Sequence, residues 1–456
     1  MLGLLGLSRE ATLVSWTVLA IVALIVLVAR FKLNAFLALM LASLIVGLCS
    51  DMPPARVAKA FQEGVGNTLG FIAVVVGLGT MLGKMLSESG GAEVIAHTFL
   101  RAFGTKRLQW TLMLVGFVVG LPVFFAVGLV LLMPILVALA RDTKRPLLFL
   151  GIPLLAGLSV SHGLVPPHPG PMLAIGMLGA NVGRTILYGI IIGVPTAIVA
   201  GPLFGKLIAD RVPIELGGLG ETLVSKSRRQ RCPSFATTIG TILLPVVLML
   251  GATVADLQLA VHSPGRIWLD FMGSPAVAML VATLVSLYTF GFACGFTRAE
   301  ILKFTEECVG PAAGIILVVG AGGGFSKVLD ESGAGAVLAQ QAGNLHVSVL
   351  LLGWLIAAAI RVAVGSATVS ITLAASLVVP MLAVAPGTNR ELLVISLGAG
   401  SLILSHLNDG GFWFVKEYFG MTVPETLKSW MVMETLISVV ALALVLALDF
   451  VLRLWV

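Results

Sequence analysis

The feature that most constrains this chain is the length of its uncharged, apolar runs. Leu108–Ala140, for example, covers 33 residues without one charged side chain. Only 11% of the 456 residues are charged, whereas soluble proteins carry about 25%. With about 20 apolar residues for each crossing, the chain has room for roughly ten to thirteen membrane segments. We therefore predict an all-α polytopic integral membrane protein.

The charge distribution predicts topology rather than nucleic-acid binding. The net charge is +6, but the basic residues are scattered over short loops between apolar runs. Such residues mark the cytoplasmic side of a membrane protein. The first apolar run, Ala11–Ala29, lacks a basic leader and a cleavage motif, which favours a retained membrane helix over a signal peptide.

One stretch between two apolar runs cannot form a regular helix throughout. Ser161–Pro171 contains four prolines, two glycines and two histidines in eleven residues. Proline removes a backbone donor and clashes with the preceding helical turn. Interrupted backbone at membrane depth is tolerated only inside protein or beside a cavity. We expect a broken membrane helix here that forms part of a ligand site.

The chain contains an internal repeat. Gly77–Ala96 and Gly320–Ala339 are identical at nine of twenty positions at a constant offset of 243, and Ser161-His162 matches Ser405-His406 at an offset of 244. Repeats with matched interruptions are typical of secondary transporters. We predict two transmembrane repeats, at residues 1–205 and 237–456. The polar linker between them, 206–236, holds six basic and three acidic residues and is predicted to be cytoplasmic.

The flanking charges predict a re-entrant helical hairpin in each half. Basic clusters lie on both sides of Leu108–Ala140, so this run is expected to enter and return, with its tip around Pro122–Gly128. The alternative is two complete membrane crossings, for which the run is short because each crossing needs about 20 residues. The counterpart is Val347–Pro386, with its tip around Arg361–Thr368 and few basic residues nearby. This asymmetry favours inverted repeats, and Ser405–Trp413 would interrupt the second broken helix.

Arg361 is the strongest candidate for holding an anion. It lies inside an apolar run and is followed by Gly365, Ser366 and Thr368. A guanidinium matches a carboxylate bidentately, and hydroxyls with freed backbone amides suit an anion at a helix start. The alternative is an arginine that extends to the lipid headgroups.

The two breaks supply the other candidates. Asp409, beside Asn408, could bind a cation, carry a proton or accept a substrate hydroxyl; alternatively it caps the next helix. His162 could exchange a proton or bind a hydroxyl, and His168 could do the same or act structurally. We expect freed backbone at Gly163 and Pro167 to face the ligand.

Enzyme and cofactor signals are missing from the sequence. The spacing of the two histidines, with no nearby acid, does not fit a zinc site. The region of Lys84 lacks P-loop spacing, and no GxSxG occurs. We therefore predict a transporter without cofactor or metal. A passive channel and an intramembrane enzyme are weaker alternatives.

Four segments resemble the gluconate permease family of bacterial symporters. The segment GIPLLAGLSVSHGLVPPHPGPMLA (Gly151–Ala174) is similar to its signature region. Arg361–Ala375 and His406–Val440 resemble two further blocks in the expected order, and Phe124–Ile135 looks like the first hairpin region. The resemblance extends over most of the chain.

The resemblance implies uptake of gluconate or a related hydroxy-carboxylate with protons, across the bacterial inner membrane. It also implies kinship with the ion transporter superfamily, whose members carry paired hairpins and are often dimeric. Sodium coupling and D-serine transport are the alternatives within this architecture. The chain departs from the family pattern at Ala126, where glutamate is frequent, and at Gly410, where serine or alanine is common. The first departure moves proton coupling to Asp409 or His162.

Overall fold

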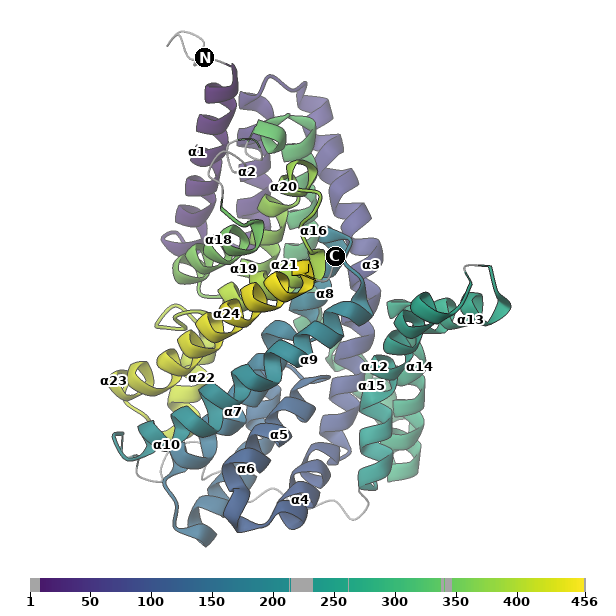
Figure 1. Ribbon diagram of the computed structural model, residues 1–456, viewed down its shortest axis with the longest axis vertical. Coiled ribbons are helices and arrows are strands. Elements are labelled where there is room, and N and C mark those ends of the chain that lie inside the picture. The colour runs from purple at the N-terminus through teal and green to yellow at the C-terminus, as the bar shows by residue number, and fades with distance from the viewer. Residues whose placement is uncertain are drawn as a thin grey trace.

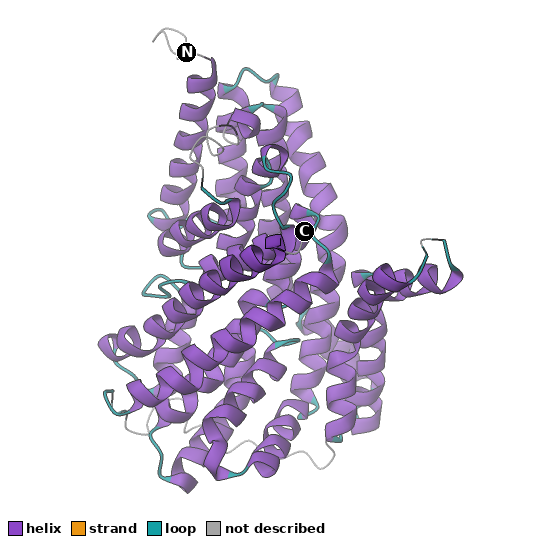
Figure 2. Ribbon diagram, viewed as in Figure 1, coloured by secondary structure: helices purple, strands orange, loops and turns teal. Residues whose placement is uncertain are grey.

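The computed structural model describes residues 9–212, 214, 233–260, 262–337, 340 and 347–454. Every regular element among these residues is a helix, and no strand occurs in them (Figure 2). Nine helices in this part of the chain are long and apolar enough to cross a bilayer, and four further apolar helices are shorter. The predicted all-α polytopic membrane protein is confirmed.

One group of helices forms a scaffold along the side of the molecule (Figure 1). Its longest member, α3, has 35 residues and packs along α16 and α14. The helices of this group are α1 (Arg9–Ala29), α2 (Ala35–Cys49), α3 (Pro54–Glu88), α12 (Phe235–Gln258), α13 (Pro264–Gly273), α14 (Pro275–Ser286), α15 (Arg298–Glu307) and α16 (Val309–Glu331).

The rest of the first half consists of a helix pair, a broken helix and a long closing helix. After α4 (Gly91–Phe103) come α5 (Leu108–Gly120), α6 (Phe125–Thr143), α7 (Leu147–Leu164), α8 (Pro169–Leu178), α9 (Val182–Ile198), the π-helical turn η3 (Val199–Leu203) and α10 (Phe204–Ala209).

The second half repeats this order of elements. Its members are α18 (Val349–Val364), α19 (Ala367–Val378), α20 (Met381–Val384), α21 (Arg390–Leu402), α22 (Gly410–Phe419), α23 (Val423–Thr426), the π-helical turn η7 (Leu427–Met431) and α24 (Val432–Leu454). In Figure 1 the α5–α6 pair lies in the lower part of the molecule and α18–α19 in the upper part, with α7, α9 and α24 running diagonally between them.

Three of the four arms of the helix pairs are short, which favours re-entrant hairpins over complete crossings; the fourth, α6, has 19 residues and is long enough to cross. α5 has 13 residues, or about 20 Å at 1.5 Å per residue, whereas the hydrocarbon core is about 30 Å thick. α18 and α19 have 16 and 12 residues. The inverted orientation of the halves and the domain boundaries at 206 and 236 stay predictions; residues 213 and 215–232 of the linker lie outside the described residues.

The structure corrects three sequence-based boundaries. The first tip covers residues 121–124, because Val127 and Gly128 already belong to α6. The first interruption is narrower than expected: α7 continues through His162 and Gly163 to Leu164, so only 165–168 leave the helix. The residue before a proline disfavours the helical conformation, so α7 ends at Leu164 and Val165, which precedes Pro166, is extended. The second tip is residues 365–366, and Thr368 already lies in α19.

Candidate functional site

Arg361 lies in the last turn of α18, at the tip of the second hairpin, and only 3% of its surface is exposed. Its Nη1 donates a hydrogen bond to the Gly365 carbonyl, and its Nη2 forms an ion pair with Asp409. The alternative of an arginine extending to lipid headgroups is therefore wrong, because such a side chain would leave the protein interior. Arg361 is a buried, paired cation.

The hairpin tip is shaped by Gly365, which has a φ of 81° and ends α18 in the left-handed conformation. A Cβ atom at this position would lie 2.2 Å from the carbonyl oxygen of Asn408. Ser366 then starts α19 as its N-cap, accepting a bond from the Val369 amide at 3.4 Å. The carbonyl of Thr368, in the first turn, accepts the Thr372 hydroxyl. The tip thus touches the second break directly.

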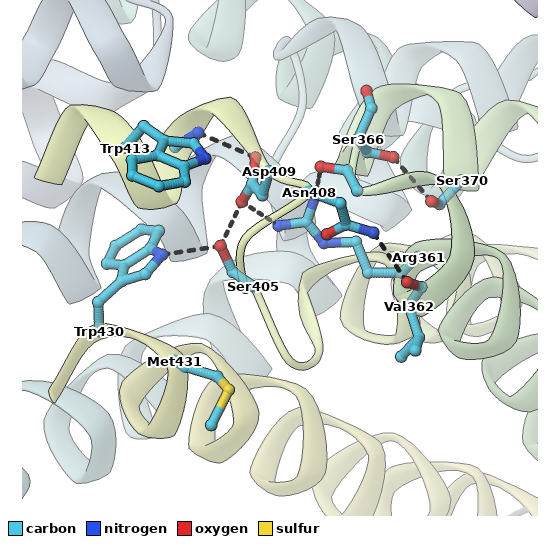
Figure 3. Close-up of polar contacts among 12 residues, drawn as sticks. Arg361, Val362, Ser366, Ser370, Ser405, Asn408, Asp409, Trp413, Trp430 and Met431 are labelled. Carbon is cyan, nitrogen blue, oxygen red and sulfur yellow. Dashed lines mark hydrogen bonds and ion pairs between the residues drawn. The ribbon is translucent and has the colours of Figure 1, made fainter. Parts of the chain in front are cut away.

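The second break, residues 403–409, carries the partner of Arg361 (Figure 3). Asp409 is the N-cap of α22, as one of its sequence interpretations expected, and accepts the Gly411 amide at 2.9 Å. Its roles towards a cation, a proton or a substrate hydroxyl stay predictions. Its other oxygen also accepts the hydroxyl of Ser405. Ser405 in turn accepts the indole N–H of Trp430 at 2.7 Å.

Asn408 connects the second break to α18, the first arm of the second hairpin, by a hydrogen bond. Its Nδ2 donates to the Val362 carbonyl at 2.8 Å (Figure 3). Its Oδ1 is buried and has no hydrogen-bond partner in the protein. One acceptor therefore remains for a ligand.

The first break holds the two histidines together. Nδ1 of His162 lies 3.1 Å from Nε2 of His168, and the His168 ring makes an edge-on contact with Phe124 of the first hairpin tip at a centroid distance of 5.6 Å. His168 is buried. Together with Pro167, which follows a cis peptide bond, it lines a small pocket that also includes Pro122.

The structure brings most of the predicted residues into one cluster. His162 lies within electrostatic range of Arg361 and Asp409. Pro167 and His168 face the first hairpin tip instead. Gly163 serves packing: a Cβ there would lie 2.6 Å from the Leu402 side chain on α21. We define the cluster of His162, Arg361, Gly365, Ser366, Asn408 and Asp409 as the central site.

Sequence reasoning missed Ser405, Trp430 and Glu434. Glu434 is 1% exposed and lies inside an apolar run on α24. An acidic residue in such a run is itself a signal, because intramembrane carboxylates are costly. Ser405 and Trp430 gave no such signal, because only the fold brings them to Asp409.

The central site suits a ligand with a carboxylate and hydroxyls. Nε of Arg361 and Oδ1 of Asn408 are buried without partners in the protein, and buried polar groups are rarely left unpaired. One is a charged donor and the other an acceptor. Within the described residues no group of three or more His, Cys, Asp or Glu side chains could hold a metal ion.

Comparison with known proteins assigns the chain to a family. The model of the GntP family permeases matches residues 12–451. A gluconate permease of Pseudomonas aeruginosa is 50% identical over 98% of this chain and 100% of its own length. A high-affinity gluconate transporter of Escherichia coli is 41% identical over 95% and 98%. A D-serine transporter of Escherichia coli is 38% identical over 98% and 100%.

Solved structures share the fold at low sequence identity. The YdaH transporter of Alcanivorax borkumensis superimposes with a TM-score of 0.65 at 18% identity, over 93% of this chain and 97% of its own. MtrF of Neisseria gonorrhoeae, from a class of antimetabolite efflux pumps, gives a TM-score of 0.65 at 14% identity, over 92% and 96%.

Proposed function

Because the chain belongs to the GntP permease family, we propose that it imports gluconate or a related small hydroxy-carboxylate by proton symport. It is a multi-pass protein of the bacterial inner membrane, and its relatives are named as permeases and transporters rather than enzymes. The observation that carries the proposal is the buried Arg361, held between the second hairpin tip and the second break.

Arg361 receives the substrate carboxylate by exchange of partners. In the present arrangement Asp409 neutralises the guanidinium. Breaking a buried ion pair without replacement costs about 3–5 kcal/mol. A substrate carboxylate removes this cost for Arg361, because it replaces one anion by another. The unpaired Nε provides a further donor, so the substrate can bind bidentately.

The hydroxyls of a sugar acid find partners beside the arginine. The unpaired Oδ1 of Asn408 accepts one hydroxyl. His162, which shares a hydrogen bond with His168, offers a second polar contact within electrostatic range of Arg361. A site built to bind hydroxyls discriminates strongly against ligands that lack them, because its buried polar groups are then left unpaired.

D-Serine is the second candidate substrate, since one relative at 38% identity is a D-serine transporter. This molecule also combines a carboxylate and a hydroxyl, and it adds an ammonium group. If the carboxylate of D-serine binds Arg361 in place of Asp409, Asp409 can form an ion pair with the ammonium group of D-serine. A sugar acid has no cation to offer, so its hydroxyls must satisfy Asp409 instead.

Uptake by purified protein in proteoliposomes tests the substrate and the coupling ion together. We expect labelled gluconate to accumulate above the external level under an inward proton gradient, and not under a sodium gradient alone. Competition with unlabelled L-idonate and D-serine ranks the substrates. Accumulation driven only by sodium would make the chain a sodium-coupled carrier, and equilibration without accumulation would make it a channel. A chemically altered product would identify an enzyme.

Two arginine variants test the site. Arg361→Ala is expected to lose gluconate binding. The matched control is Arg266→Ala. Arg266 lies on the peripheral α13 and forms a partly buried ion pair with Asp256 of α12. This variant should bind gluconate like the wild type. Unchanged gluconate affinity in Arg361→Ala would remove Arg361 from the site.

A further inference from the structure

Glu434 is a buried carboxyl group that the binding site does not use. It lies on α24, is 1% exposed, and its Oε1 has no hydrogen-bond partner in the protein. Ser159 of α7, itself buried, lies within hydrogen-bonding reach of the carboxyl group. No ion pair to Glu434 occurs among the described residues. A charged carboxylate without a cation is very costly in such surroundings, so burial favours the neutral, protonated form of Glu434.

Glu434 belongs to a polar stripe that faces the central site. Trp430, Glu434 and Ser438 are spaced four residues apart and are all buried; such a spacing places side chains on one helical face. Trp430 donates to Ser405 in the second break. Ser438 accepts the indole N–H of Trp354 on α18 at 3.0 Å. The stripe therefore connects both elements that hold the Arg361–Asp409 pair.

Two charged groups act on Glu434: Arg361 from α18 and Asp409 from the start of α22. Their charges are opposite and paired, so they largely cancel at Glu434. The elements packed against α24 carry these further ionisable side chains: His162 on α7, Arg184 and Tyr188 on α9, Arg390 and Glu391 on α21, and Lys428 on η7. In the described part of the chain none of them forms an ion pair with Glu434.

The two coupling candidates from the sequence are engaged elsewhere. Asp409 accepts bonds from Arg361, Ser405 and the Gly411 amide. These three donors occupy both of its carboxylate oxygens. His162 shares its Nδ1 with His168. In the part of the chain that the structure describes, only Glu434 combines full burial, an unpartnered carboxyl oxygen and proximity to the Arg361–Asp409 pair.

We propose that Glu434 is the proton-binding group of the transport cycle, and this inference rests on the proposed import of an anion. When the substrate carboxylate joins Arg361, the central site gains one negative charge. That charge favours the neutral, protonated form of Glu434, because opposite changes in charge offset each other at short range. By linkage, a proton on Glu434 strengthens substrate binding by the same factor. Release of the substrate inside allows the proton to leave.

The test compares Glu434→Gln with Glu93→Gln in proteoliposomes. Glu93, on α4, is the matched control because it also has a buried carboxyl oxygen without a partner and is not part of the central site. Glutamine imitates protonated Glu434. We therefore expect Glu434→Gln to exchange labelled for unlabelled gluconate but not to accumulate it under a proton gradient. Glu93→Gln should do both.

Binding to purified protein provides a second readout. As the pH rises through the range in which Glu434 deprotonates, the gluconate affinity of the wild type should fall about tenfold per pH unit. This is the slope expected when substrate binding is linked to the binding of one proton. In Glu434→Gln the affinity should no longer depend on pH, whereas Glu434→Asp, which keeps a titratable group, should restore the dependence.

Three results would overturn the inference: accumulation by Glu434→Gln under a proton gradient, wild-type pH dependence of its affinity, or loss of exchange in this variant. If Glu434→Gln does not fold, a folded Glu434→Asp with pH-independent affinity overturns it equally. Failure of the wild type to accumulate gluconate would instead refute the proposed function, and the inference with it.

Discussion

Replacing Gly365 by alanine tests whether contact between the second hairpin tip and the second break organises the central site. Gly365 has a φ of 81°, where a non-glycine residue costs about 1–2 kcal/mol. The new Cβ would lie 2.2 Å from the Asn408 carbonyl oxygen, so the break would have to retreat by about 1 Å to reach an ordinary contact. A displacement of about 1 Å can lower a rate by about 100-fold. We expect a loss of that order in gluconate uptake.

The matched control is Gly333→Ala. Gly333 has a φ of 76°, and a Cβ there would meet nothing within 4 Å. Both variants share the backbone strain, and only Gly365→Ala moves the break. Initial rates of proteoliposome uptake, normalised to folded protein from thermal unfolding, separate the two effects. Equal uptake by both variants would show that the tip–break contact does not set the geometry of the site.

Three further predictions use the same assays. Arg361→Lys keeps the positive charge but loses the two parallel donors of the guanidinium. Gluconate affinity should therefore fall by about tenfold to a hundredfold, as for loss of a charged hydrogen bond. Wild-type affinity in this variant would show that the substrate is not bound bidentately. Trp430→Phe removes the hydrogen bond to Ser405 and should lower the free energy of unfolding by about 1 kcal/mol. An unchanged melting temperature would show that this hydrogen bond does not contribute to stability. The hydrogen bond from Lys84 lowers the pKa of the Glu307 carboxyl below its ordinary 4.5, so the pair stabilises the fold above that pH and the contribution is lost as the pH falls through the lowered value. Glu307→Gln should therefore melt slightly earlier than wild type at neutral pH, with the difference vanishing in acid; a difference that persisted in acid would contradict this origin.

The sequence located the interruptions because their causes are local. Prolines and glycines act on the turn in which they stand, so the block around Pro166 and the tip at Gly365 were found within a few residues. The exact limit of the first break was missed because a proline restricts only the one residue before it, so His162 stays in α7. The packing of Gly163 against Leu402 of α21 could not be predicted from the sequence, because only the fold brings the two residues together.

The charged pair could be proposed from its members but not as a pair. Arg361 and Asp409 are each ionisable residues between apolar runs. Such residues are costly in a membrane, so their presence in a sequence indicates a functional role. That one neutralises the other follows only from the contact between the hairpin tip and the break. Trp430 and Ser405 are unremarkable in sequence, since aromatic and small polar side chains are ordinary in membrane helices. Their hydrogen bond exists because α24 passes beside the break.

The internal repeat predicts the backbone of the second half far better than its chemistry. The last turn of α5 has no basic residue, whereas the same turn of α18 carries Arg361. The broken helices resume after His168 in one half and after Asp409 in the other. At the repeat offset of 244, Glu434 of α24 corresponds to Ile190 of α9. The guanidinium and the two carboxyl groups at the centre thus lie in the second half of the chain, and the first half contributes the two histidines. A charge-balanced exchange of partners needs this asymmetry, because a second arginine and aspartate would offer the substrate carboxylate two competing places to bind.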